Sequence, residues 1–148
     1  MNISKFTQKS IEAVQNMEKV AATHGNQQIE QIHLLASLLD IEGSLIVNLI
    51  KKMGINEIEF RNEVEAAIEK LPKVSGGQSY ISNDLNKILI TSEDVAKSMG
   101  DEYVSVEHIF LNLLENPSSN VAQIFRMYGI NKNKFLQVLS EVRGNQRV

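Results

Sequence analysis

Lys-Lys-Met-Gly-Ile-Asn-Glu-Ile-Glu-Phe, residues 51–60, returns seventy-five positions later as Arg-Met-Tyr-Gly-Ile-Asn-Lys-Asn-Lys-Phe, residues 126–135. Extending this alignment without gaps places residues 6–67 on residues 81–142, where 12 of the 62 pairs are identical. Many other pairs exchange one apolar residue for another. Because identities that cluster at a constant offset are typical of internal duplication, we predict that the chain contains two copies of one unit.

Each copy is predicted to form four helices. In the second copy, apolar residues between 85 and 99 recur at the 3.6-residue spacing of a helix with one buried face, and Gly100 ends that helix. Gly129-Ile130-Asn131 combines a helix stop, an apolar residue and a new N-cap, which predicts a tight corner between two helices. The first copy repeats this scheme.

The predicted fold class is all-α, with eight helices arranged as two four-helix repeats related by a pseudo-two-fold axis. Repeat one is expected at about residues 4–71 and repeat two at about 81–143, joined by residues 72–80, which hold one Pro and two Gly. A unit of about 65 residues buries only about 60% of its unfolded surface. We therefore expect both repeats to share one core in a single domain over residues 1–148, with residues 144–148 beginning a linker.

Composition excludes several classes of protein. The 148 residues carry 15 Lys and Arg against 18 Asp and Glu, a net charge of −3, which gives no general reason to bind nucleic acid or an anionic membrane. No Cys is present, so disulfides and cysteine-ligated metals are excluded. No stretch approaches the roughly 20 apolar residues that span a bilayer, and the N-terminus lacks a secretory signal. We expect a cytoplasmic protein without nucleic-acid or membrane partners.

Motifs for catalysis are absent from the sequence, including the phosphate-binding loop, H-E-x-x-H and G-x-S-x-G. His33 and His108 occupy equivalent positions at the starts of two apolar helices, where a general base or a metal ligand is one interpretation. Duplication instead favours the same helix-start hydrogen bond made twice, because an active site seldom occurs in two equivalent copies. His24 is placed to face the C-terminal end of the first helix. We predict no catalytic residue, metal site or cofactor in this chain.

Differences between the repeats indicate a candidate binding surface. In the alignment of the two repeats, three apolar residues of repeat two match three glutamines of repeat one: Ile90, Tyr103 and Val106 match Gln15, Gln28 and Gln31. Packing inside the domain and an exposed surface for other chains are both open interpretations. We hypothesise that the three apolar residues contribute to a peptide-binding surface, and burial of all three would contradict this.

Residues 100–108, Gly-Asp-Glu-Tyr-Val-Ser-Val-Glu-His, within two four-helix units resemble the amino-terminal domain of the Clp family of AAA+ unfoldases. Three stretches are similar to its ClpB disaggregase branch: Leu71-Pro72-Lys73-Val74-Ser75-Gly76, Asn26-Gln27-Gln28-Ile29-Glu30 before His33-Leu34-Leu35, and the ending Arg143-Gly144-Asn145-Gln146-Arg147-Val148. The ClpC branch more typically has Gly-Thr-Glu-His-Ile-Leu-Leu-Gly-Leu in both units, which this chain lacks. The resemblance covers nearly the whole chain.

The resemblance implies a non-catalytic, substrate-recruiting domain that binds exposed apolar segments of unfolded or aggregated polypeptides. It implies a parent ClpB hexamer that works with the DnaK chaperone system, and ATPase modules beyond residue 148 that hold ATP and magnesium. The isolated domain is expected to be monomeric. An adaptor-docking domain of a ClpC-like, protease-associated unfoldase is the alternative, and a small helical hydrolase is a third hypothesis.

The resemblance also carries family positions onto this chain. Positions implicated in chaperone activity match Thr7, Asp101 and Glu107, although a helix start explains Thr7 and favourable charges at helix ends explain the two acids.

The family's apolar groove, on the fifth and sixth helices, matches Leu89, Thr91, Val95 and His108. Thr91 and His108 are polar where relatives often carry Leu, so a weaker or shifted groove is expected. Leu89 and Val95 also lie on the predicted core stripe, which limits how much of each side chain is exposed.

Overall fold

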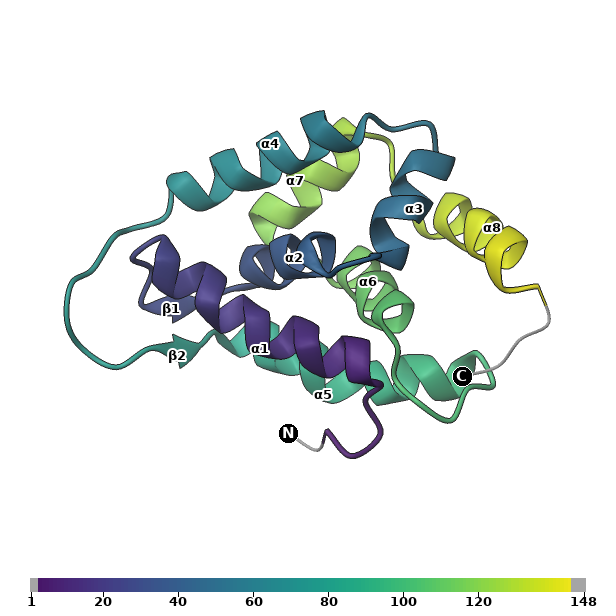
Figure 1. The fold of residues 1–148 in the computed structure, drawn as a ribbon, viewed down its shortest axis with the longest axis horizontal. Coiled ribbons are helices and arrows are strands. Elements are labelled where there is room, and N and C mark those ends of the chain that lie inside the picture. The colour runs from purple at the N-terminus through teal and green to yellow at the C-terminus, as the bar shows by residue number, and fades with distance from the viewer. Residues whose placement is uncertain (1–2, 145–148) are drawn as a thin grey trace.

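The computed structural model describes residues 3–144, and within them the chain forms eight helices and one pair of two-residue strands (Figure 1). The helices are α1 (Gln8–Thr23), α2 (Gln31–Asp40), α3 (Leu45–Lys52), α4 (Glu57–Glu69), α5 (Asn83–Ser98), α6 (Val106–Glu115), α7 (Ser119–Met127) and α8 (Lys132–Arg143); the strands are β1 (Gln28–Ile29) and β2 (Tyr80–Ile81). The all-α prediction is confirmed. Both ends of α5 and of α6 fall seventy-five residues after those of α1 and α2.

The Gly-Ile-Asn corners use the same helix stop and the same N-cap in both repeats. Gly54 and Gly129 take φ angles of 79° and 64°, in the left-handed region that favours glycine. Asn56 and Asn131 are the N-caps of α4 and α8, and each side chain accepts a hydrogen bond from the backbone N–H three residues later. The predicted sequence of helix stop and new N-cap is therefore confirmed in both copies.

Short strands join one repeat to the other. β1 pairs in parallel with β2, with Ile29 opposite Ile81, and an isolated bridge pairs Phe6 with Val104. Phe6 and Ile81 occupy equivalent positions, as do Ile29 and Val104, so each repeat makes the same contact to the other. A two-fold relation produces such reciprocal contacts, and it supports the predicted pseudo-symmetry.

The core is centred on α2 and α6, which lie in the middle of the molecule with α1 and α5 on one side and α3, α4, α7 and α8 on the other (Figure 1). One polar bond to a neighbouring helix is made twice: the Ser37 hydroxyl donates to the carbonyl of Ala13 at 2.6 Å, and the Asn112 amide donates to that of Ile88 at 3.0 Å. These bonds fix α2 against α1 and α6 against α5 in the same register.

The linker predicted at residues 144–148 lies, apart from Gly144, outside the described residues. Within residues 3–144 no single helix has the length and apolar character needed to cross a membrane, although α2 and α3, bent by 91°, meet those criteria as a pair.

Candidate functional site

His33 and His108 hold the beginnings of α2 and α6. In each ring Nδ1 accepts a hydrogen bond from the backbone N–H of the helix N-cap residue, at 2.8 Å and 2.9 Å. Nε2 therefore carries the proton, and it donates to Asn26 at 2.9 Å in the first ring and to Asp101 at 2.7 Å in the second. Burial lowers the pKa of His33 to about 4. The predicted helix-start hydrogen bond, made once in each repeat, is confirmed.

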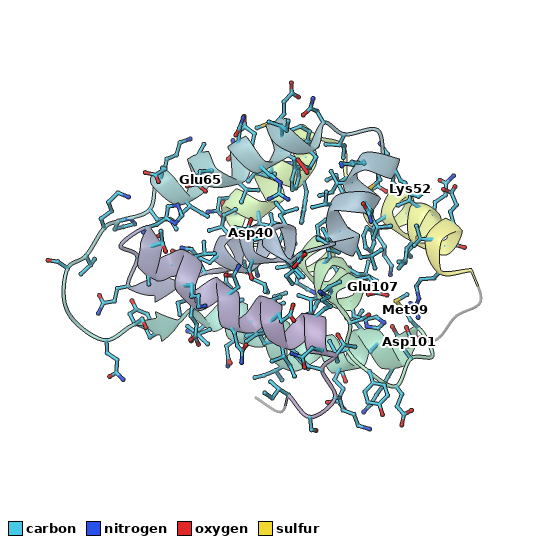
Figure 2. The ribbon with its side chains drawn as sticks, in the orientation of Figure 1. Asp40, Lys52, Glu65, Met99, Asp101 and Glu107 are labelled. Carbon is cyan, nitrogen blue, oxygen red and sulfur yellow. The ribbon has the colours of Figure 1, made fainter. Side chains whose placement is uncertain are left out.

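A buried ion network distinguishes repeat two. Arg143, the last residue of α8, donates from Nη2 to Asp101 at 2.6 Å, and its Nε lies 3.8 Å from a carboxylate oxygen of Glu107. Both acids are 4% exposed, and Figure 2 shows them near the end of α5 and the start of α6. The equivalent positions of repeat one hold buried uncharged residues: Asn26, Ile32 and Ile68. The Asp101 side chain thus makes its bonds inside the domain and presents little surface to a ligand.

A pocket of about 300 Å³ lies between the starts of α1 and α6 and the turn from α2 to α3. Its walls are mainly apolar, and three predicted site residues meet there: Thr7, Val106 and Glu107. We call it the junction pocket, and it is lined by Thr7, Lys9, Ile41, Gly43, Ser44, Leu45, Ser105, Val106 and Glu107.

Thr7 begins α1 and ties it to repeat two. Its hydroxyl oxygen accepts from the backbone N–H of Ser10 at 3.3 Å and donates to the Ser10 hydroxyl at 3.0 Å. The Ser10 hydroxyl in turn donates to the carbonyl of Val104 at 2.9 Å. The helix-start role expected for Thr7 is confirmed, and its half-buried side chain forms part of the pocket wall.

Gln31 fills the corresponding place in repeat one. Its side chain is buried, donates to the carbonyl of Asn116 at 3.0 Å and accepts from the backbone N–H of Ser118 at 2.8 Å. That turn after α6 corresponds to the turn after α2 that borders the junction pocket. Val106, the counterpart of Gln31, is shorter and has no amide, and it lines the junction pocket.

A second depression, the α5–α6 groove, has a volume of about 500 Å³ and includes Thr91 and Val95 among its lining residues. The structure corrects the expectation for Leu89 and His108, which are 2% and 0% exposed and do not line it. Leu89 lies on the buried stripe of α5, and both ring nitrogens of His108 are engaged in the core. Of the four family groove positions, only Thr91 and Val95, which are half-buried, line the α5–α6 groove.

Ile90 and Tyr103 are exposed, with 55% and 43% of their surface accessible, as the repeat comparison hypothesised. Val106 differs, because only 8% of its surface is accessible, and it lines the junction pocket. A positively charged neighbour accompanies Tyr103: Lys5 Nζ lies 5.7 Å from the centre of its ring.

Sequence reasoning missed Ile41, Leu45 and Arg143. The first two line the junction pocket and stand opposite Asn116 and Asn120 in the repeat alignment. Val106 was chosen because an apolar residue in repeat two matches a polar one in repeat one. Ile41 and Leu45 show the reverse, with the apolar residue in repeat one and the polar one in repeat two. Comparing the repeats in both directions would have found them.

Comparison with known proteins places this geometry in context. Residues 5–128 match the family model of the Clp repeat (R) N-terminal domain. The chaperone protein ClpB of Clostridium tetani is 39% identical over 153 positions, and that of Nitratidesulfovibrio vulgaris is 40% identical over 154. Each alignment covers 100% of this chain and 18% of the relative, so the chain spans about a fifth of the length of these proteins.

Solved structures share the fold. The Hsp104 N-terminal domain from Candida albicans superposes with a TM-score of 0.84 at 25% identity, covering 97% of this chain and 95% of that one. A ClpV N-domain in complex with a VipB peptide gives a TM-score of 0.73 at 18% identity and covers 95% of this chain and 88% of that one.

Proposed function

This chain belongs to the Clp repeat N-terminal domain family, and from that premise we propose that it is the substrate-recruiting domain of a ClpB-type protein disaggregase. In this proposal it binds exposed apolar segments of unfolded or aggregated polypeptides and performs no catalysis itself. ATP hydrolysis with magnesium, assembly into a hexamer and cooperation with the DnaK system belong to a parent protein of that type, which acts in the cytoplasm.

The junction pocket is the observation that carries this proposal. It is a mainly apolar cavity, and Ile41, Leu45 and Val106 supply carbon surface for an inserted side chain. A pocket of about 300 Å³ buries little of a polypeptide. Because ordering an unfolded chain costs free energy that so small a contact offsets only partly, binding will be weak.

The charges around the junction pocket favour an apolar ligand over a charged adaptor. Lys9, at its edge, pairs with Glu12 at 3.8 Å, and Glu107, in its wall, lies near Arg143. With each charge accompanied by an opposite one, the pocket offers little net charge to a partner. Binding of an unfolded chain will therefore depend weakly on salt, whereas docking of a charged adaptor face will weaken steeply as salt is added.

A titration of this chain with a permanently unfolded polypeptide tests the proposal. The probe is reduced, carboxymethylated lactalbumin, followed by NMR chemical shifts and by fluorescence anisotropy. We expect shifts at Thr7, residues 41–45 and residues 105–107. Leu45→Asp places a charge in the wall and will weaken binding by at least about tenfold, the cost of leaving a charge unpaired in an apolar contact.

Ile58→Asp is the matched control. Like Leu45, Ile58 is an apolar residue in the first turn of a helix, where Asp is favourable, but it is 67% exposed and does not line the junction pocket. We expect it to leave binding unchanged. Equal binding by Leu45→Asp and the parent chain would refute the pocket as the site. Shifts confined to Thr91, Val95 and their neighbours would move the site to the α5–α6 groove.

A further inference from the structure

A series of polar contacts leaves the junction pocket at one wall residue and returns to it at another. Ser105, which lines the pocket, donates its backbone N–H to His108, and the other nitrogen of that ring donates to Asp101. Arg143 then contacts both Asp101 and Glu107, and Glu107 lines the pocket again. The series is buried, and the side chain of Arg143 is only 10% exposed. Two wall residues of the pocket are therefore connected through Arg143.

Arg143 belongs to two depressions of the surface at once. Its Nε lies 3.8 Å from a carboxylate oxygen of Glu107, in the wall of the junction pocket. It also borders a depression of about 250 Å³ beside the end of α8. Figure 2 shows Met99, which borders that depression, close to Asp101 and Glu107. A change at the pocket wall therefore has a short route, through one side chain, to the last residue of α8.

The fold itself does not require these charges. Repeat one forms the same helix starts with Asn26, Ile32 and Ile68 at the equivalent positions, and all three are buried and uncharged. Burying charged groups costs solvation free energy, and a well-packed apolar set is often equally or more stable. Since stability does not call for the charges, their contact with the junction pocket points to a role in binding.

We propose that Arg143 is a positioning residue for the junction pocket and acts on the ligand through Glu107. This inference rests on the proposed binding of an apolar side chain in that pocket. A ligand beside Glu107 excludes water from the wall, so an ionised carboxylate there costs more free energy unless a cation stays close to it. Arg143 supplies such a cation. Because coupling between two sites is reciprocal, a bound ligand also strengthens the hold of Glu107 on the end of α8.

A double-mutant cycle tests this coupling, with reduced, carboxymethylated lactalbumin as the probe. Arg143→Gln is expected to weaken probe binding by at least about fivefold in the parent chain. In a chain that carries Glu107→Gln it will weaken binding by less than about twofold, because no carboxylate remains for the cation to accompany. Arg143→Lys keeps the positive charge and will recover part of the loss. Fluorescence anisotropy measures the affinities, and circular dichroism checks that each variant is folded.

Arg126→Gln is the matched control. Arg126 also lies in the last turn of its helix, α7, but it is exposed and does not line the junction pocket. We expect this variant to bind the probe as tightly as the parent chain.

NMR follows the coupling without changing Arg143, so this measurement holds even where Arg143→Gln fails to fold. The Arg143 Nε resonance will shift when the parent chain is saturated with probe and will stay fixed in Glu107→Gln. Absence of probe binding by the parent chain would overturn the proposed function and this inference together. Binding that leaves the Arg143 resonance fixed, or that Arg143→Gln weakens equally with and without Glu107, would overturn the coupling alone.

Discussion

Val106 occupies in repeat two the position that Gln31 occupies in repeat one, and only Gln31 reaches the turn it faces. Its amide makes two hydrogen bonds to that turn, at 3.0 Å and 2.8 Å, and ties the start of α2 to it. Val106 has no amide to make such bonds, and it lines the junction pocket together with the corresponding turn. The two residues therefore contribute to the different surfaces that the repeats present at equivalent places.

Val106→Gln is expected to close the junction pocket from within. The longer side chain will occupy volume now open to a ligand, so binding of the unfolded probe will weaken by about tenfold, or 1.4 kcal/mol. The free energy of unfolding will change little, because the new side chain enters existing space. Fluorescence anisotropy and urea unfolding measure the two quantities.

Val106→Ala is the control for this substitution, since it enlarges the pocket instead of filling it. It is expected to lower stability by about 1 kcal/mol through lost burial and to retain binding. The turns differ in detail, because Gly43 takes a φ of 67° and Ser118 one of −69°, so the expected effect rests on volume and not on new hydrogen bonds. Binding by Val106→Gln as tight as that of the parent would place the ligand elsewhere.

Helices and corners were predictable because their signals are local. The apolar stripe of α5, the stop at Gly100 and the Asn131 cap each act within one turn of helix, and all appear where expected. The strands were not predicted. β1 and β2 hold two residues each and pair across 51 intervening positions, from Ile29 to Ile81, so no local pattern reports them.

The site was only partly predictable, because exposure depends on contacts between distant segments. Thr7, Val106 and Glu107 meet in one pocket although they lie on two helices. His108 was expected in a groove but is buried, because Asp101 and its own helix start engage both ring nitrogens. Arg143, which contacts the carboxylates of Asp101 and Glu107, lies on α8. Nothing in the sequence around Arg143 predicts these contacts.

Gly54→Ala and Gly129→Ala are expected to cost similar stability, about 1 kcal/mol each, because both glycines take positive φ. An added methyl group meets nothing within 4 Å at either position, so the cost is that of the backbone alone. The double variant will lose about the sum. Gly54→Asn, which tolerates this conformation better than Ala, will recover part of it. Urea unfolding measures all four, and an Ala variant as stable as the parent would contradict the assignment.

Replacing all three charged residues of the buried network around Arg143 is expected to preserve stability, whereas replacing Arg143 alone is not. Arg143→Ile removes a cation that contacts both Asp101 and Glu107 and will destabilise the chain by about 3 kcal/mol. The triple variant Asp101→Asn, Glu107→Ile, Arg143→Ile copies the residues of repeat one and will lie within about 1 kcal/mol of the parent. Urea unfolding at pH 7 compares them. A triple variant as unstable as Arg143→Ile would show that the network does more than balance charge.

Acid is expected to remove the stability that His33 contributes. Its pKa is lowered from 6.5 to about 4 in the folded chain, so the unfolded chain binds the proton more readily. The contribution is complete above pH 6.5 and decreases as the pH falls from 6.5 to about 4, where about 3 kcal/mol is lost. His24 acts oppositely: its raised pKa adds stability below pH 6.5 that is lost as the pH rises through that pKa.

Comparison with His33→Asn isolates the His33 contribution, because both chains share every other titrating group. The difference in unfolding free energy between parent and variant, measured in urea at pH 7.5 and pH 4.5, will shrink at the lower pH. NMR of the parent will show the His33 ring neutral until about pH 4 while His24 titrates above 6.5. A His33 ring that titrates near 6.5 would mean that its bonds to Glu30 and Asn26 open readily, and the acid sensitivity would then need another source.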